Sequence, residues 1–260
     1  MTISVENRWL VIPRPNPRAQ VRLFCLPYAG AGSVMYRNWV DVLPNFIELV
    51  AIELPGRGKR LLETPYNDLD KLILDLAAAL ESHLNRPYAI FGHSMGALIG
   101  FELIRYFRRH GLPLPVQLFV SGRNAPTIPD DTDPPLHTLP DAEFKEKLKE
   151  LDGTPVEVLE HQELMDILLP ILRADFRMCE IYVYRPEPPL DIPITAFGGI
   201  KDISIKPEQV EAWKEQTRAP FSARFFPGGH FFLNDFRMEI IEIVTRELEI
   251  RMRTLAMKQE

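Results

Sequence analysis

The chain has 260 residues, 46% of them hydrophobic and 25% charged, with a formal net charge of −6. This composition predicts a soluble globular protein of one domain, residues 1–260, and the acidic balance excludes a general nucleic-acid-binding surface. The two cysteines, Cys25 and Cys179, form neither a disulfide framework nor a metal-ligand spacing. We therefore expect buried thiols, no metal and a reducing, cytoplasmic compartment.

The first segment, residues 1–16, contains a short apolar group at residues 9–12 among charges and prolines. This group is too short for the core of a signal peptide, and no other apolar run reaches the length of a membrane span. We therefore expect no membrane segment and no membrane partner.

Along the rest of the chain, short apolar runs alternate with longer amphipathic ones, which is typical of an α/β protein whose mainly parallel sheet is covered by helices. A helix is predicted after a capping Asn67 or Asp68, because apolar residues recur at i, i+3 and i+4 up to Leu84. A second helix is predicted over residues 95–110, where basic residues precede Gly111. The predicted strands are residues 21–26, 46–54, 88–91, 116–121, 194–197 and 223–226.

The loop after the first predicted strand, residues 27–32 (PYAGAG), is rich in small residues that let the backbone approach a ligand closely. Its Gly30-x-Gly32 pattern, with Glu53 at the end of the next strand, also resembles a dinucleotide-binding fingerprint. However, Met35 stands where the third glycine belongs, and the fingerprint leaves the catalytic candidates below unexplained. Nucleotide binding is therefore an alternative, which a bound nicotinamide or flavin would support.

The segment Gly92-His93-Ser94-Met95-Gly96 follows a buried strand and opens a helix. This context is typical of a nucleophile elbow, in which a strained turn leaves no room for side chains at the flanking positions. The turn would lift Ser94 over the carboxyl edge of the sheet at a helix N-terminus, where the helix dipole favours developing negative charge. We predict that Ser94 is the nucleophile of a serine hydrolase with the α/β-hydrolase fold.

The alternation of strands and helices is interrupted over residues 123–189. A loop rich in Pro and Asp is followed there by a charged predicted helix around residues 142–151. An apolar helical stretch comes next, residues 164–184, which we expect Pro170 to kink or divide. Its apolar residues lie around more than one helix face, so a second face can line a pocket. We predict that this insertion is a helical lid, with an additional helical layer that has no gating role as the alternative.

A serine hydroxyl is a weak nucleophile at neutral pH and needs a base within hydrogen-bonding distance. Of the six histidines, only His230 directly follows the last predicted strand, in a Gly-Gly-His turn that places the imidazole at the carboxyl edge. The acid that orients the imidazole is expected in a loop after a strand, and Asp202 has that position. The alternatives, all in the insertion, are Asp130, Asp131, Asp133 and Asp175.

The oxyanion of a tetrahedral intermediate needs hydrogen-bond donors, which are usually backbone amides from two places. One is expected from Met95, directly after the nucleophile, and the other from the 27–32 loop, where Ala29 is the best candidate. This chemistry requires no cofactor, and we expect none.

Five segments of the chain resemble those of the type II thioesterases, the stand-alone thioesterases that accompany nonribosomal peptide and polyketide synthases. They are FCLPYAGAG, ELPGRGKR, IFGHSMGALIGFEL, LPILRADF and FPGGHFFL. The vertebrate medium-chain thioesterase of fatty acid synthesis is also similar, and the resemblance runs from about Val21 to Thr245. In the segment SGRNAP, Asn124 stands where many relatives carry a second basic residue.

By position, the resemblance implies Ser94 as nucleophile, Asp202 as acid and His230 as base, with the Met95 and Ala29 amides in the oxyanion hole. It also implies a helical lid over an acyl channel. The implied reaction is hydrolysis of acyl groups from the phosphopantetheine arm of acyl or peptidyl carrier proteins, which edits misprimed or stalled synthase modules. The alternatives are a product-releasing thioesterase, a general carboxylesterase or lipase, and a catalytically silent binding protein of a synthase complex.

The loop Gly56-Arg57-Gly58-Lys59-Arg60 follows the second predicted strand and brings three cations near the expected site. Carrier proteins and the phosphate of their arm are anionic, and guanidinium groups bind phosphate bidentately. We therefore predict that Arg57, Arg60 and Arg123 help to receive the carrier, with a solvated basic turn as the alternative.

Overall fold

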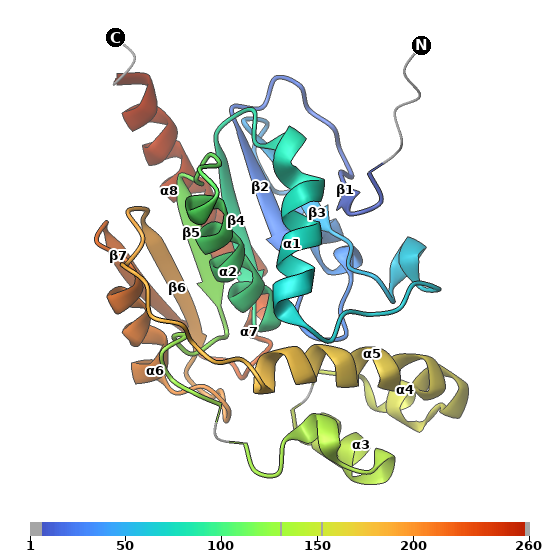
Figure 1. Ribbon diagram of the computed structural model, residues 1–260. Helices are drawn as coiled ribbons and strands as arrows, with labels where there is room; N and C mark the ends of the chain where they lie inside the picture. The colour runs from blue at the N-terminus through green and yellow to red at the C-terminus, as the bar shows by residue number, and fades with distance from the viewer. Residues whose placement is uncertain (1–6, 131, 152, 258–260) are drawn as a thin grey trace, which may run out of the picture.

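The computed structural model describes residues 7–130, 132–151 and 153–257, whose strands form one seven-stranded sheet. The strand order is β1-β3-β2-β4-β5-β6-β7; β1 is antiparallel to β3, and the other neighbours are parallel. Helices cover both faces of the sheet, so the chain has the predicted α/β-hydrolase fold (Figure 1). The strands are β1 (Leu10–Val11), β2 (Val21–Leu26), β3 (Ile47–Ile52), β4 (Tyr88–His93), β5 (Gln117–Ser121), β6 (Ile194–Gly199) and β7 (Phe221–Phe226).

All six predicted strands are present, and their ends differ from the prediction by no more than two residues. Strands β3, β4, β5 and β6 are buried along their whole length, which explains their continuous apolar runs. The prediction missed β1, because a strand of two residues is too short to show a period.

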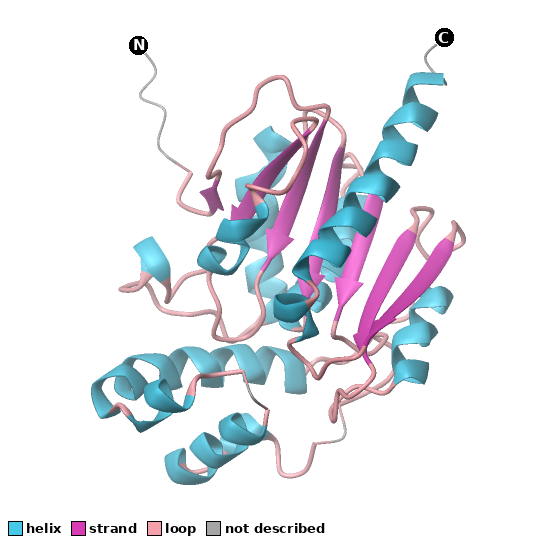
Figure 2. Cartoon of the chain, turned by 180° about the vertical axis from the view of Figure 1, so that it is seen from behind, coloured by secondary structure: helices cyan, strands magenta, loops and turns pink. Residues whose placement is uncertain are grey.

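Each face of the sheet has its own apolar core. One face is covered by α1 (Leu69–Leu80), α2 (Met95–Arg109) and α6 (Pro207–Glu211), whose apolar residues join one cluster. The other face is covered by the 3₁₀ helix Ser33–Trp39 and by α8 (Arg237–Met257), which crosses the back of the sheet (Figure 2). Among the described residues, no helix combines the length and the apolar character that crossing a bilayer requires.

The predicted helices are present, and of the two effects expected from Pro170, a kink or a division, the division does not occur. Asp68 is the residue that caps α1, since its carboxylate accepts a hydrogen bond from the Lys71 amide. In the insertion, Pro170 does not divide the apolar stretch: α5 runs unbroken from Gln162 to Glu180. A proline inside a helix removes one backbone hydrogen bond, and its ring crowds the carbonyl four residues before it, at a cost of about 3 kcal/mol. The buried apolar side chains on both sides of Pro170 offset that loss.

The insertion between β5 and β6 forms a layer of helices across the carboxyl ends of the strands (Figure 1). These helices are α3 (Asp141–Glu150), the unpredicted α4 (Val156–Glu160), and α5. A third, separate apolar cluster holds them together, so the layer has a small core of its own. Its buried members are Phe144, Leu148, Leu159, Met165, Leu169 and Leu172. The short helix α7 (Phe232–Asp235) follows β7 near the same edge of the sheet.

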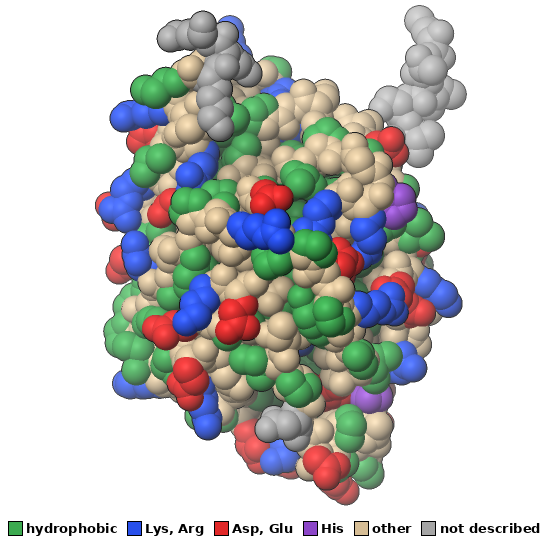
Figure 3. Space-filling model, turned by 60° about the vertical axis from the view of Figure 1, so that its left-hand side comes forward, with side chains coloured by type: hydrophobic (Ala, Val, Ile, Leu, Met, Phe, Trp, Pro, Cys, Tyr) green, Lys and Arg blue, Asp and Glu red, His purple; other side chains and the backbone are tan. Residues whose placement is uncertain are grey.

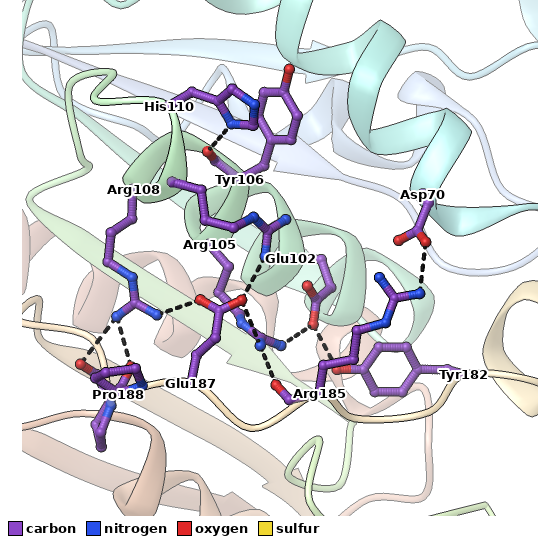
Figure 4. Close-up of polar contacts among 12 residues, drawn as sticks. Asp70, Glu102, Arg105, Tyr106, Arg108, His110, Tyr182, Arg185, Glu187 and Pro188 are labelled. Atoms are coloured by element: carbon purple, nitrogen blue, oxygen red, sulfur yellow. Dashed lines mark hydrogen bonds and ion pairs between the residues drawn. The ribbon is translucent and has the colours of Figure 1, made fainter.

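The segment that returns from α5 to β6 is fastened to α2 by a cluster of ion pairs (Figure 4). The carboxylate of Glu187 lies 2.9, 2.7 and 2.6 Å from the guanidinium groups of Arg105, Arg108 and Arg109. Burial alone would raise the pKa of Glu187, but hydrogen bonds from the three arginines lower it to about 2. The carboxylate is therefore ionised at neutral pH, and the return end of the insertion is held against the sheet.

Candidate active site

Ser94 occupies the turn between β4 and α2 in a strained backbone conformation. Its φ is +51° and its ψ is −114°, and it is the only non-glycine residue with a positive φ in the described part of the chain. Such a conformation costs on the order of 1–3 kcal/mol and persists only where the surroundings impose it. Here the Ser94 amide donates a hydrogen bond of 2.7 Å to the Ser121 carbonyl at the end of β5. The strained strand-to-helix turn that the motif predicts is therefore present.

The two glycines of this turn lie where a Cβ atom would collide with backbone. A Cβ on Gly92 would lie 2.2 Å from the Gly96 carbonyl oxygen, and one on Gly96 would lie 2.3 Å from the Leu26 carbonyl oxygen. Backbone atoms cannot move aside as the end of a flexible side chain can. The turn therefore requires glycine at both positions, for the steric reason expected from the sequence.

His230 and Asp202 are joined directly by a hydrogen bond. His230 Nδ1 lies 2.7 Å from Asp202 Oδ2, while Oδ1 accepts the amides of Ser204 and Ile205 at 2.9 and 3.1 Å. An ionised carboxylate can only accept hydrogen bonds, so Nδ1 carries a proton and Nε2 keeps a free lone pair. The Asp202 side chain is 1% exposed and that of His230 is 15% exposed. The acid is thus shielded from water, and the ring reaches the cavity beyond it.

The loops that carry Asp202 and His230 pack against each other so closely that no side chain fits between their backbones. A Cβ on Gly199 would lie 2.3 Å from the Gly229 carbonyl oxygen, and the Lys201 amide donates to the Gly228 carbonyl at 2.9 Å. This close approach fixes the loop after β6 against the loop after β7. The acid and the imidazole are therefore positioned by backbone contacts as well as by their own hydrogen bond.

Ser94 and His230 line the same cavity, which has a volume of about 160 Å³ and lies between the sheet edge and the insertion. No hydrogen bond joins the Ser94 hydroxyl to the imidazole among the hydrogen bonds of the described residues. Such contacts are often long before a substrate binds, so the lack of this hydrogen bond does not exclude His230 as the base of Ser94. The apolar part of the cavity wall includes Leu136, Leu148, Leu151, Leu172, Phe176 and Phe231.

The two backbone amides predicted for the oxyanion hole are both available. Met95 is the first residue of α2, and the first amides of a helix have no acceptor within the helix. Ala29 lines the cavity together with Ser94. Within the described ranges, neither amide has a hydrogen-bond acceptor. An oxyanion formed at Ser94 could therefore receive both of them.

His93 lies directly beneath the site and is completely buried. Its Nδ1 lies 2.9 Å from the Ser121 hydroxyl, and its ring centroid lies 5.2 Å from that of His230. Burial, with a smaller contribution from His230, lowers the pKa of His93 well below its usual value, so the ring is neutral. His93 is therefore a buried packing residue of the elbow, a role that the sequence did not predict.

The other candidate residues have different partners. Cys179 also lines the cavity, but burial raises the pKa of its thiol to about 11, so it stays protonated and is a poor nucleophile at neutral pH. The remaining histidines after Ser94 are His110, which stacks on Tyr106, His137, which pairs with Glu180, and His161, which caps α5. Of the alternative acids, Asp130 and Asp133 are exposed, Asp175 is paired with Arg57, and Asp131 lies outside the described residues.

The arginines predicted to receive a carrier have different environments. Arg57 and Arg60 are each only 6% exposed, and their guanidinium groups hold the carboxylates of Asp175 and Glu63. Guanidinium groups that already form buried ion pairs within the protein cannot also bind the phosphate of a partner. The structure therefore gives Arg57 and Arg60 an internal role, against the docking prediction. Arg123 is half-buried and lines the cavity, so it remains the candidate for docking.

The residues of the dinucleotide fingerprint are also occupied. The buried carboxylate of Glu53 accepts the Ser33 amide at 3.1 Å and the Ser33 hydroxyl at 2.8 Å. A Cβ on Gly32 would lie 2.7 Å from the same carboxylate. Glu53 therefore holds the chain at the end of the 27–32 loop through Ser33 and is not free to bind a ribose.

Comparisons with known proteins agree with this fold. A family model for the thioesterase domain matches residues 21–248. The gramicidin S biosynthesis protein GrsT of Aneurinibacillus migulanus is 45% identical over 248 residues, which are 95% of this chain and 96% of GrsT. A protein named linear gramicidin dehydrogenase LgrE, from Brevibacillus parabrevis, is 44% identical over 246 residues, covering 94% of this chain and 93% of LgrE. Among solved structures, the type II thioesterase BorB from the borrelidin biosynthetic cluster matches with a TM-score of 0.85 and 39% identity, over 93% of this chain and 98% of BorB.

Proposed function

This chain belongs to the thioesterase family, among the type II thioesterases, and we propose that it hydrolyses acyl groups from the phosphopantetheine arm of acyl or peptidyl carrier proteins. Membership of the family makes it a hydrolase that acts on thioesters. We further propose that Ser94, Asp202 and His230 perform the reaction and that it edits misprimed or stalled synthase modules. The observation that carries this proposal is the strained Ser94 in a cavity shared with His230, whose Nδ1 is bonded to Asp202.

The reaction proceeds by two acyl transfers. His230 Nε2 takes the proton of the Ser94 hydroxyl as the oxygen attacks the thioester carbonyl, and the Met95 and Ala29 amides stabilise the oxyanion. The carbon–sulfur bond then breaks, and the pantetheine sulfur takes the proton from His230. Water, deprotonated by the same imidazole, next attacks the acyl-serine ester, so that the free acid leaves and Ser94 regains its proton.

The helical layer of residues 123–189 is proposed to act as a lid within the single domain of residues 1–260. Two observations support this role. The layer has an apolar cluster separate from the two clusters of the sheet, and it supplies Leu136, Leu148 and Phe176 to the cavity wall. The part of the layer that shares this small core, α3, α4 and the first half of α5, can shift without exposing the main core, whereas Met178 and Cys179 in the second half of α5 belong to the main core.

The volume of the cavity favours a small acyl group. About 160 Å³ is close to the ~150 Å³ of an engineered apolar cavity that holds one benzene molecule. A short acyl chain therefore fits in this cavity with the insertion in the described position. Short acyl groups such as propionyl or butyryl are the expected preferred substrates.

The proposal is tested by presenting one butyryl group in three forms: on a carrier protein, on free pantetheine and as a matched oxygen ester. The expected order of kcat/KM is carrier thioester, free thioester, oxygen ester. Equal kcat/KM for the two thioesters would contradict carrier recognition, and equal kcat/KM for thioester and oxygen ester would favour a general carboxylesterase. Repeating the carrier assay with decanoyl checks the size of the cavity, since decanoyl is expected to react more slowly.

Carrier recognition is expected to depend on Arg123. On the face shown in Figure 3, basic and acidic side chains are interspersed, so recognition there would rely on single local cations. We expect Arg123→Glu to lower kcat/KM for the carrier-bound thioester about 10-fold, which corresponds to about 1.4 kcal/mol and is near the lower end for a lost hydrogen bond to a charged group. The free butyryl-pantetheine control separates this loss from damage to the chemistry. The matched variant is Arg218→Glu, an exposed arginine at the other end of the sheet. Equal losses from both variants, or on both substrates, would contradict a docking role.

The name of LgrE raises dehydrogenase activity as a second candidate. In this chain, however, the groups that would hold a dinucleotide are already bonded: Glu53 accepts from Ser33, and the Gly30 amide donates to Asp175. Because these contacts leave none of those groups free to bind a dinucleotide, they argue against dehydrogenase activity and leave hydrolysis as the preferred function. Tight binding of a reduced nicotinamide cofactor to the purified protein, seen by fluorescence, would reverse that preference.

A further inference from the structure

A fully buried carboxylate lies on the apolar face of helix α5 and contacts the predicted oxyanion loop. Asp175 is 0% exposed, although its neighbours on the same helix face, Leu172 and Met178, belong to apolar clusters. Asp175 Oδ2 accepts the Gly30 amide at 2.8 Å and Arg57 Nη1 at 2.8 Å, while Oδ1 accepts Arg57 Nη2 at 2.9 Å. The carboxylate thus joins three parts of the chain that are far apart in sequence.

Arg57 completes a clamp around the same loop. Its Nη1 also donates to the Ala31 carbonyl at 3.0 Å, and its Nε donates to the Pro55 carbonyl at 3.3 Å. The amide of Gly30 and the carbonyl of Ala31 are therefore both fixed by this ion pair. They are the polar backbone groups that closely follow Ala29, whose own amide faces no acceptor among the described residues.

Helix α5 also packs directly against the 27–32 loop, beside the ion pair. Gly30 has a φ of +79°, and a Cβ there would lie 2.5 Å from the Leu172 side chain. The loop has little rigidity of its own, because residues 27–32 consist mainly of Gly and Ala. Its conformation is thus imposed by α5 on one side and by Glu53, which holds Ser33 directly after the loop, on the other.

A buried ion pair is not in itself a sign of stability. Replacing such a pair by apolar side chains is often neutral or stabilising, because desolvation of the two charges cancels much of their attraction. Here the ion pair fixes the relative orientation of the two side chains and of the segments that carry them, because a bidentate guanidinium–carboxylate contact has only one good geometry. Donors to an oxyanion must be placed within about 0.5 Å to be effective.

We propose that Asp175 and Arg57 are positioning residues that hold the Ala29 amide where the oxyanion forms. This inference rests on the proposed function, because it assumes acyl transfer at Ser94. It assigns the second half of α5 to the catalytic machinery and not to the covering layer.

The test is Asp175→Asn, which keeps the shape of the side chain but removes its charge. Because loss of one oxyanion donor lowers kcat about 10²–10³-fold, displacement of one is expected to lower kcat for butyryl-pantetheine about 50-fold. KM should change less than about 3-fold, since the ground-state carbonyl depends little on this donor. A trifluoromethyl ketone, which forms a tetrahedral oxyanion on serine, should lose affinity by a factor similar to that in kcat. If Asp175 had only a structural role, Asp175→Asn would not lower kcat selectively over KM, and it would not lower the affinity for the trifluoromethyl ketone.

The matched control is Glu48→Gln at the opposite end of the sheet. Glu48 is 5% exposed and forms a buried ion pair of 2.8 Å with Arg22, at the start of β2 and β3. We expect a comparable fall in the urea midpoint of unfolding but an unchanged kcat. If Asp175→Asn lowers kcat no more than Glu48→Gln does, the proposal is overturned.

A second variant keeps the proposal testable if Asp175→Asn does not fold. Arg57→Lys keeps the charge but loses the bidentate contact and the bond to Ala31, and it is expected to lower kcat about 10-fold. An unchanged kcat in a folded Arg57→Lys protein would contradict the positioning role. Failure of the proposed function has a different signature, because the unmodified protein and Glu48→Gln would then also lack activity on thioesters.

Discussion

We expect Ser94→Ala to lower kcat on acyl thioesters by a factor on the order of 10⁵–10⁶, the loss seen when the nucleophile of a serine triad is removed. The remaining activity would come from the oxyanion donors and from substrate binding alone. The fold should not change. Alanine has the same Cβ at the same positive φ, and the Ser94 hydroxyl makes no hydrogen bond to another described residue. Thiol release from butyryl-pantetheine measures kcat, and urea unfolding checks that the midpoint is unchanged.

The control for Ser94→Ala is Ser204→Ala, which removes a second hydroxyl from the same cavity. Ser204 contacts Asp202 through its amide and not through its hydroxyl, so kcat should change less than about 5-fold. A fluorophosphonate probe should label the unmodified protein and Ser204→Ala but not Ser94→Ala. Activity retained in Ser94→Ala would assign the chemistry elsewhere, and absence of labelling in the unmodified protein would support a catalytically silent binding protein.

The sheet and the elbow were predictable because each is specified by neighbouring residues. Strands buried on both faces require continuous apolar runs, and the crowding around Gly92 and Gly96 is visible as glycine in the motif. The pairing of Asp202 with His230 was predictable for a related reason. Both follow parallel strands, and the carboxyl ends of parallel strands meet at one edge of the sheet.

The environment of the charged residues was not predictable, because it depends on contacts between distant segments. Arg57 looks like a solvated loop cation in the sequence, but its partner Asp175 is 118 residues away. The sequence does contain one signal of this ion pair. Asp175 stands three residues from Leu172 and three from Met178, on the otherwise apolar buried face of an amphipathic helix. A carboxylate at such a position requires a buried donor, and an arginine is the most suitable one.

The second large effect is expected from Asp202→Asn, because this change alters which nitrogen of His230 carries the proton. The asparagine oxygen should take the place of Oδ1 and accept the amides of Ser204 and Ile205. Its NH₂ group then faces Nδ1, which must become an acceptor, so the proton moves to Nε2. An imidazole protonated at Nε2 cannot take a proton from Ser94. The expected loss in kcat is about 10⁴-fold, with little change in KM or in the urea midpoint.

The control for Asp202→Asn is Asp130→Asn, which changes the exposed alternative acid that lines the same cavity. Asp130 makes no contact with His230 among the described hydrogen bonds, so kcat should change less than about 5-fold. Nitrogen NMR of the histidine rings supplies an independent readout, since only Asp202→Asn should exchange the protonated and unprotonated nitrogens of His230. If Asp130→Asn caused the large loss instead, the acid would lie in the insertion. The helical layer would then complete the catalytic site as well as cover it.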